Sequence, residues 1–285
     1  MQTKRLTLTH LQRSEWRGQL NAMSDAYPVR DTLWNMEKNG AQTAIQVDEN
    51  NRIVAFFTMM PGVQEGDAVG LIFGNGEGAT ETFTEEAMRL FGHKVLRMQV
   101  PQKHFHATAE RLGIIKNFTI LHYHGDAPGS QPDGVELVSG DMFEALSGED
   151  IVQMRRLLEY AVSVEEKHDR LKREHLKHYD SSNVIKRMKD FGFFSMVYRV
   201  EGEVVGMIAA QAGSQWVEVC GLAVSEEHQR KGVGTNLILG LMHLLGEYYN
   251  QFAAMVFTDN VDSVGLFTKL GFEEEAALFM KLVED

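Results

Sequence analysis

The stretch that decides the fold is Leu222-Ala-Val-Ser-Glu-Glu-His-Gln-Arg-Lys-Gly-Val-Gly-Thr-Asn-Leu237. Its apolar start predicts a strand that ends near Val224, and a polar turn follows. Gly232 and Gly234 then open a predicted helix that runs to about Tyr249. A turn at the positive end of a helix offers a row of backbone N–H groups to a phosphate, and glycine lets the phosphate approach closely. Taken alone, the stretch also fits a tight turn with glycine at a helix start.

A second glycine-containing stretch supports the phosphate-binding interpretation. It reads Asn260-Val-Asp-Ser-Val-Gly-Leu-Phe-Thr-Lys-Leu-Gly-Phe272, downstream of Gln229-Arg-Lys-Gly-Val-Gly234. Together the two stretches resemble the coenzyme A motifs of the GCN5-related N-acetyltransferase (GNAT) superfamily. Those motifs read Arg/Gln-x-x-Gly-x-Gly/Ala and Asn-x-x-Ala-x-x-Leu-Tyr-x-Lys-x-Gly-Phe. Both occur here in order and at normal separation, so the resemblance covers roughly residues 135–285, and a degenerate version covers the first half.

The resemblance implies an acyl-CoA-dependent N-acyltransferase that moves an acetyl group from acetyl-CoA to a primary amine in a ternary complex. Backbone groups of Leu222 and Val224 would pair with the pantetheine arm, and a bulge or splay near that strand would open the cleft. Amides of residues 230–235 would hold the pyrophosphate, and Asn260 would hydrogen bond to the cosubstrate. No metal is expected. The predicted cosubstrate contacts are Leu222, Ala223, Val224, Gln229, Arg230, Lys231, Gly232, Val233, Gly234, Thr235, Asn260, Ser263 and Phe267.

The chemistry requires a group that takes a proton, because an alkylamine is almost entirely protonated at neutral pH. Glu218 matches the position of a glutamate base in some GNAT enzymes, and we predict it to be the catalytic residue. The alternative is a solvent-facing strand glutamate. Phe267 stands where the family usually has a tyrosine that protonates the thiolate. The thiolate therefore leaves unassisted, or another donor serves, or the domain is a catalytically slow CoA-binding module used for sensing or regulation.

The order of predicted elements indicates an α/β fold with a mixed, mostly antiparallel sheet flanked by helices, in two such domains. We assign residues 1–126 to a degenerate GNAT-like domain, 127–134 to a linker rich in Pro, Gly and Ser, and 135–285 to the catalytic domain. The first half has Gly74-Asn-Gly-Glu-Gly78 in place of a pyrophosphate loop, and the charge of Glu77 would oppose phosphate. We therefore expect this half not to bind CoA but to close the substrate cleft or to mediate homodimerisation.

The composition limits the partners. The 285 residues carry a net charge of −12 at pH 7, which disfavours nucleic acid as a partner and is compatible with a cationic acceptor. The single cysteine, Cys220, excludes an internal disulfide. No apolar run has the length of a signal peptide core or a membrane span, so a cytoplasmic protein without membrane contact is expected. The acceptor stays open between a small amine, an amino acid, an antibiotic and a peptide N-terminus.

Overall fold

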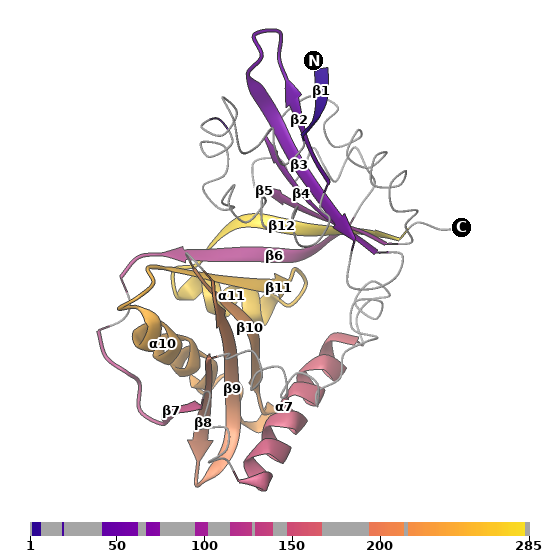
Figure 1. The fold of residues 1–285 in the computed structure, drawn as a ribbon. Coiled ribbons are helices and arrows are strands. Elements are labelled where there is room, and N and C mark those ends of the chain that lie inside the picture. The colour runs from indigo at the N-terminus through magenta and orange to yellow at the C-terminus, as the bar shows by residue number, and fades with distance from the viewer. Residues whose placement is uncertain are drawn as a thin grey trace. The chain divides into compact units, whose positions relative to one another are not determined.

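The computed structural model describes residues 2–6, 19, 42–61, 67–74, 95–101, 115–126, 129–138, 147–166, 194–213 and 216–282 (Figure 1). Contacts divide the chain into two units. The first consists of Met1–Phe118 together with Glu275–Asp285, and the second of Thr119–Glu274. None of the helices in these described ranges combines the length and the apolar character needed to cross a bilayer.

The first unit holds a sheet whose strands follow the order β1-β2-β3-β4-β5-β12. The bounds are β1 (Gln2–Leu6), β2 (Gln42–Val47), β3 (Ile53–Pro61), β4 (Asp67–Gly74), β5 (Val95–Pro101) and β12 (Glu273–Leu282). Neighbouring strands are antiparallel except β4 and β5, which are parallel. Strands β2 and β3 form a hairpin, and in its turn the Asp48 carboxylate accepts hydrogen bonds from the backbone N–H groups of Asn50 and Arg52.

The second unit holds a sheet in the order β6-β11-β10-β9-β8-β7. The bounds are β6 (Ile115–His124), β7 (Val135–Val138), β8 (Phe194–Val200), β9 (Glu203–Ala212), β10 (Val217–Val224) and β11 (Gln251–Phe257). Strands β7 to β10 pair antiparallel, whereas β10 and β11 run parallel. The predicted mixed, mostly antiparallel sheet is therefore confirmed.

Helices cover both faces of this second sheet. On one face lie α10 (Val233–Leu245) and α11 (Val261–Lys269), with a core that includes Leu237, Ile208 and Phe252. On the other face lies α7 (Gly148–Glu166), which packs on alternate residues of the same strands, among them Met207. Figure 1 shows α10 and α7 on opposite sides of β9. The close approach of α10 requires a glycine on β9, because a Cβ at Gly206 would lie 2.6 Å from Cγ1 of Val233.

Local sequence signals account for most of these elements. Glu201 and Gly202 both adopt positive φ, at 53° and 90°, which is the geometry of a tight hairpin turn between β8 and β9. Helix α10 ends at Leu245 rather than near Tyr249, and its C-cap is Gly246, which keeps a right-handed φ of −68°. The sequence also indicates helices at residues 84–91 and 165–179, and these, like the Gly74–Gly78 loop, lie wholly or mostly outside the described residues.

The division by contacts places residues 119–126 in the second unit and residues 275–285 in the first. Strand β6 runs from the first unit into the second, and residues 276–282 of β12 pair with β5. The pairing of β12 with β5 joins residues far apart in the sequence, and no local pattern encodes it. The boundaries at 126 and 135, and the different roles given to the two halves, stay predictions.

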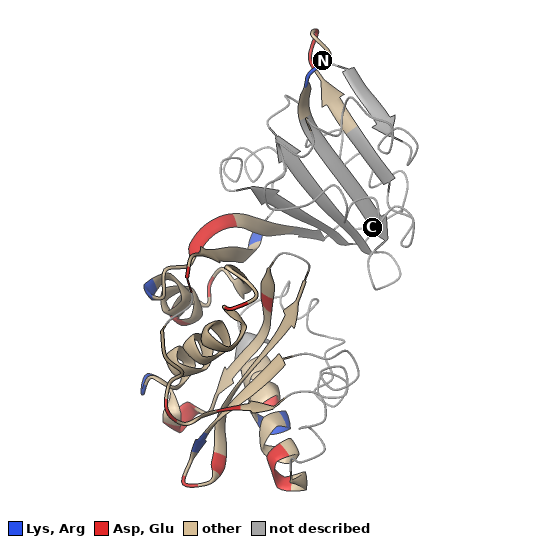
Figure 2. Cartoon of the chain, turned by 60° about the vertical axis from the view of Figure 1, so that its left-hand side comes forward, with Lys and Arg blue, Asp and Glu red and all other residues tan. Residues whose placement is uncertain are grey.

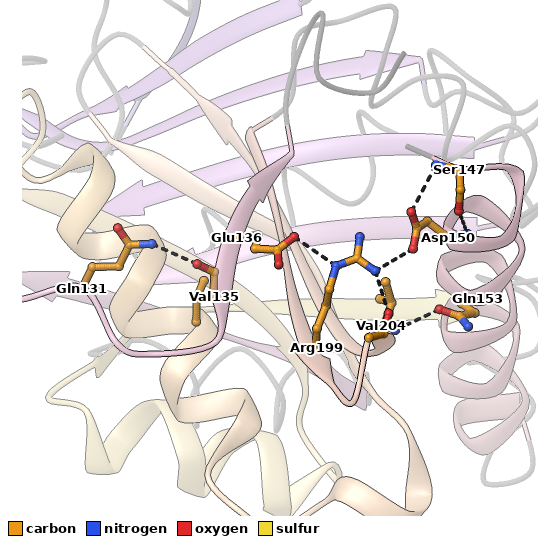
Figure 3. Close-up of polar contacts among 9 residues, drawn as sticks. Gln131, Val135, Glu136, Ser147, Asp150, Gln153, Arg199 and Val204 are labelled. Carbon is orange, nitrogen blue, oxygen red and sulfur yellow. Dashed lines mark hydrogen bonds and ion pairs between the residues drawn. The ribbon is translucent and has the colours of Figure 1, made fainter. Parts of the chain in front are cut away.

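A polar network ties the start of α7 to the β8–β9 hairpin (Figure 3). Ser147 and Asp150 exchange backbone-to-side-chain hydrogen bonds of 3.1 and 3.0 Å, which cap the N-terminus of α7. The Arg199 guanidinium donates to Asp150 Oδ1 at 2.6 Å and to Glu136 Oε2 at 3.0 Å. Gln153 on α7 accepts a hydrogen bond from the backbone N–H of Val204 at 2.8 Å. The helix is therefore fixed at its first turn.

The hydroxyl of Ser195 is buried in this unit without a hydrogen bond to any described residue. Ser195 on β8 has no exposed surface, and its hydroxyl has no hydrogen-bond partner in the structure as described. We expect Ser195→Ala to raise the free energy of unfolding by about 1 kcal/mol, because it removes an unpaired hydroxyl. Urea denaturation measures the change. Ser225→Ala is the matched control and should destabilise, since its hydroxyl lies 2.9 Å from Nδ1 of His228. A loss of stability in Ser195→Ala would contradict the prediction.

Candidate functional site

The strands β10 and β11 separate partway along their length. They pair only at Val217↔Phe252, Glu218↔Ala253 and Val219↔Ala254, although β10 continues to Val224 and β11 to Phe257. Beyond Val219 the β11-facing edge of β10 therefore has no partner in the described ladder. This is the splay that the sequence resemblance implies.

A β-bulge lies at the point of separation. The register of β10 with β9 shifts between Val219↔Ala210 and Gly221↔Ala209, which leaves Cys220 as the extra residue. Because the bulge reverses the alternation of side chains, Val217 and Val219 before it and Leu222 and Val224 after it all contact the α10 core. The predicted bulge is thus confirmed, and Cys220, which is exposed, marks its position.

The free edge of β10 exposes alternate backbone groups. The Ser225 N–H donates to the Val205 carbonyl at 2.9 Å, so residue 225 points toward β9. By strand alternation, the N–H and C=O groups of Leu222 and Val224 point the other way, toward the side that β11 has left. The Val224 carbonyl accepts one hydrogen bond there, from Nε2 of Gln229 at 3.1 Å. An extended ligand could add to this edge as a further strand.

The loop after β10 forms a concavity of backbone N–H groups. Arg230 and Gly232 adopt left-handed φ angles of 57° and 86°, and α10 begins directly afterwards. A left-handed residue followed by a helical one turns successive N–H groups toward one point, which suits an anion. The helix adds the N–H groups of Val233, Gly234 and Thr235, because first-turn amides have no partner within the helix. Its first backbone bond runs from Asn236 N to the Gly232 carbonyl at 2.9 Å.

Gly232 in the loop and Gly234 in the first turn of α10 serve different needs. A Cβ at Gly232 would meet nothing within 4 Å, so glycine is favoured there by its positive φ. A Cβ at Gly234 would lie 3.1 Å from Cδ2 of Leu266, so that glycine allows α11 to approach α10. Arg230 and Lys231 stand next to each other on the exposed side of the loop, whereas acidic segments are spread over several elements of the unit (Figure 2).

The second predicted motif has structural roles in α11. Asn260 is the N-cap, and its side-chain oxygen accepts a hydrogen bond from the Ser263 N–H at 3.0 Å. Phe267 is only 2% exposed, and its ring packs edge-on against Phe272 at 5.0 Å between centroids. A ring buried to this extent offers no surface to a ligand. We therefore leave Phe267 out of the proposed cosubstrate contacts.

Glu218 lies where the two strands begin to part. Its side chain is exposed, but burial of the carboxyl among surrounding protein atoms raises its pKa. The two observations fit a carboxyl that is surrounded by protein and remains open to water on one side. Because Val217 and Val219 face the α10 core, Glu218 projects from the opposite face, the one that α7 covers. A carboxyl with a raised pKa at the end of a free strand edge is suited to accept a proton.

The chain resembles a family of known proteins and one characterised relative in its sequence. The model of the acetyltransferase (GNAT) family matches residues 154–272. An N-alpha-acetyltransferase of Sulfurisphaera tokodaii is 31% identical over 121 residues, and the match covers 37% of this chain and 64% of that protein. The chain thus spans somewhat less than two thirds of the length of this relative.

Solved structures share the fold over the whole chain. A GCN5-related N-acetyltransferase from Sphaerobacter thermophilus superposes with a TM-score of 0.56 at 10% identity, covering 98% of this chain and 94% of that one. A tandem GNAT protein from the clavulanic acid biosynthesis pathway gives a TM-score of 0.51 at 15% identity, covering 100% of this chain and 99% of that one. At these identities the likeness concerns the fold alone. The family model and both motifs match the second unit, and this part of the chain is therefore similar to the GNAT acetyltransferases.

Proposed function

We propose that the chain transfers an acetyl group from acetyl-CoA to a primary amine by direct attack in a ternary complex. The observation that carries this proposal is the continuity of two features. The free edge of β10 at Leu222 and Val224 leads directly into the N–H concavity at residues 230–235. A thioester arm with a pyrophosphate at its far end has the shape that such an arrangement accommodates.

The proposed contacts follow from that geometry. Pantetheine amides would pair with the backbone of Leu222 and Val224, with Ala223 between them, and the pyrophosphate would accept hydrogen bonds from the loop. Arg230 and Lys231 supply positive charge there, and Gln229 holds the loop to the strand end through the Val224 carbonyl. Asn260 and Ser263 stay in the proposal through the first turn of α11. No residue is assigned to a metal.

The thioester would then lie beside Glu218. The carboxylate accepts a proton from the amine, directly or through one water, and the neutral nitrogen attacks the thioester carbon. The C–N bond forms, an oxyanion develops that a backbone N–H of the splayed strand can stabilise, and the C–S bond then breaks to release the CoA thiolate. Phe267 cannot donate a proton to that thiolate. A thiolate is an adequate leaving group near neutral pH, so the reaction can proceed without this acid.

The relative from Sulfurisphaera tokodaii suggests the acceptor. It is an N-alpha-acetyltransferase, and we propose that the α-amine of a peptide or protein is an acceptor for this chain too. Such an amine has a pKa of about 8 and is far easier to deprotonate at neutral pH than an alkylamine. We also propose a cytoplasmic location, where acetyl-CoA and nascent N-termini meet. Homodimerisation stays a prediction.

A second candidate is a slow CoA-binding module that senses or regulates. Phe267 favours the slow module. It is buried where the family has a tyrosine, and it has no hydroxyl that could protonate the CoA thiolate. The two candidates share the cosubstrate site and differ in turnover. Acetyl-CoA binding without acetylation of any amine in a broad panel would select the module.

The first experiment is calorimetric titration of acetyl-CoA into the wild type and Lys231→Glu. We expect the variant to raise Kd by about tenfold or more, because a negative charge replaces a positive one beside the pyrophosphate. Arg156→Glu is the matched control, since Arg156 is exposed on α7, on the other face of the sheet. The proposal fails if the wild type does not bind acetyl-CoA, or if both variants weaken binding equally.

A further inference from the structure

Three side chains form a row beside the predicted base. Glu218 on β10 pairs with Gln211 on β9 and with Ala253 on β11. Directly paired residues of neighbouring strands project from the same face of a sheet. Gln211 is exposed, and Ala253 is almost fully buried at 4% exposure. An amide, a carboxyl and a methyl group therefore lie side by side on the α7 face.

Met255 continues this row past the point where the strands separate. It lies two residues after Ala253, so it projects from the same face, whereas Ala254 and Val256 belong to the core on the other face. Its side chain is 41% exposed, which is unusual for a large apolar residue inside a strand between buried neighbours. The ladder with β10 ends at Val219↔Ala254, so no β10 residue pairs with Met255 in that ladder.

The position of Glu218 decides from which side an acceptor arrives. A base must contact the amine nitrogen, directly or through one water, so the acceptor has to lie on the face from which Glu218 projects. Neighbouring strands are about 4.8 Å apart and alternate residues about 7 Å apart. The carbon that carries the amine, and the groups attached to that carbon, therefore come within reach of Gln211 on one side and Met255 on the other.

We propose that Gln211 and Met255 determine acceptor specificity, and that they select an α-amine whose carbon bears an apolar side chain and a peptide group. This inference rests on the proposed transferase activity. The Gln211 amide both donates and accepts hydrogen bonds, which matches the N–H and C=O of a peptide. The Met255 thioether adapts to apolar groups of different shapes and offers nothing to a cation. A second positive charge close to the amine would be desolvated against Met255, so diamines are disfavoured.

The test compares acceptors that differ only next to the amine. The probes are two synthetic peptides with Leu or Lys as first residue and otherwise equal sequence, together with 1,4-diaminobutane. We expect the wild type to favour the Leu peptide over the Lys peptide by about tenfold or more in kcat/KM, the range that apolar contacts contribute to discrimination. The diamine should be the poorest acceptor.

Variants then assign the preference to Met255. Met255→Glu should reduce or reverse the Leu-to-Lys ratio, mainly through KM, while the Kd for acetyl-CoA is unchanged. Met255→Leu should keep the wild-type ratio. Tyr248→Glu, which also places an acid at an exposed large apolar residue (77% exposed), is the matched control and should leave the ratio as it is.

Each outcome decides one claim. A Leu-to-Lys ratio that is the same in the wild type and in Met255→Glu would overturn the inference. Turnover of the diamine without turnover of either peptide would overturn the inference and leave the transferase proposal standing. Acetyl-CoA binding without turnover of any amine would instead overturn the transferase proposal, and the inference with it.

Discussion

Glu218→Gln lowers kcat by two to four orders of magnitude and leaves acetyl-CoA binding unchanged, since general base catalysis contributes roughly that factor. The amide keeps the size of the carboxyl but cannot take the amine proton. The calorimetric Kd should stay at the wild-type value, because Glu218 lies before the free edge of β10 and away from the loop at residues 230–235. Steady-state kinetics with an excess of acceptor measure the loss in kcat.

The pH dependence provides the second measurement. Desolvation raises the pKa of Glu218 above the ordinary value of 4.5, so the wild-type activity should fall as the pH drops through that raised pKa. Protonation of the acceptor also reduces the rate at low pH. The two effects on the rate can be separated by using an acceptor whose amine has a different pKa. The fall in rate caused by Glu218 then stays at the same pH, whereas the fall caused by protonation of the acceptor moves.

The free energy of unfolding should depend on pH in the opposite sense to the activity. The folded state favours the protonated carboxyl, so wild-type stability falls as the pH rises through the raised pKa, whereas Glu218→Gln lacks this dependence.

The matched control for the loss of kcat is Glu203→Gln, at an exposed strand position on β9, and this variant should keep the wild-type kcat. A Glu218→Gln enzyme with full turnover would remove Glu218 from the mechanism.

Asp150→Ala destabilises the second unit by about 2 kcal/mol, the largest stability loss that we expect from a single polar substitution here. The carboxylate receives two bonds at once, from the Ser147 N–H and from the guanidinium of Arg199. Loss of a capping interaction costs about 1 kcal/mol, and loss of a charged hydrogen bond in a half-buried setting costs at least as much. The second carboxylate on Arg199, Glu136, is more than half exposed and compensates little.

Denaturation of the variant at several pH values tests the cause. The hydrogen bond from Arg199 lowers the pKa of Asp150 below its ordinary value of 3.8. Its stabilising effect is therefore fully present above that ordinary value and is lost as the pH falls through the lowered one, where wild type and variant should converge. Glu149→Ala removes the adjacent exposed acid and is the matched control. A double-mutant cycle that combines Asp150→Ala with Arg199→Met should give a coupling energy of about 1 kcal/mol or more. A coupling energy near zero would contradict the stabilising role of the bond between Asp150 and Arg199.

Much of the second unit could be predicted from its sequence because the signals are local. The pair Glu201-Gly202 can adopt left-handed angles, Ser147 and Asp150 stand at capping distance, and Gly232 just before α10 takes a left-handed φ. The bulge and splay came from the resemblance, and pairing at Val219↔Ala254 shows where they begin. Pairing of β12 with β5 could not be predicted, since it joins residues far apart in the chain.

For the candidate site, the directions of the backbone groups could be predicted better than the placement of the side chains. The outward direction of the Leu222 and Val224 backbone groups follows from strand alternation once one hydrogen bond, Ser225 to Val205, is known. Phe267 was included by position in a motif, and a motif does not state whether a ring faces ligand or core. Gln211 and Met255 carry no motif. Their place beside Glu218 emerges only when three strands are set in register.

The pairing of β12 with β5 has a consequence for biosynthesis. Strand β12 follows α11 in the chain, so it leaves the ribosome only after all the strands and helices of the second unit. Until then β5 keeps an unpaired edge, and open edges invite pairing with other chains. Nascent protein should therefore depend most on chaperones during this interval, although most of the first unit has already been translated.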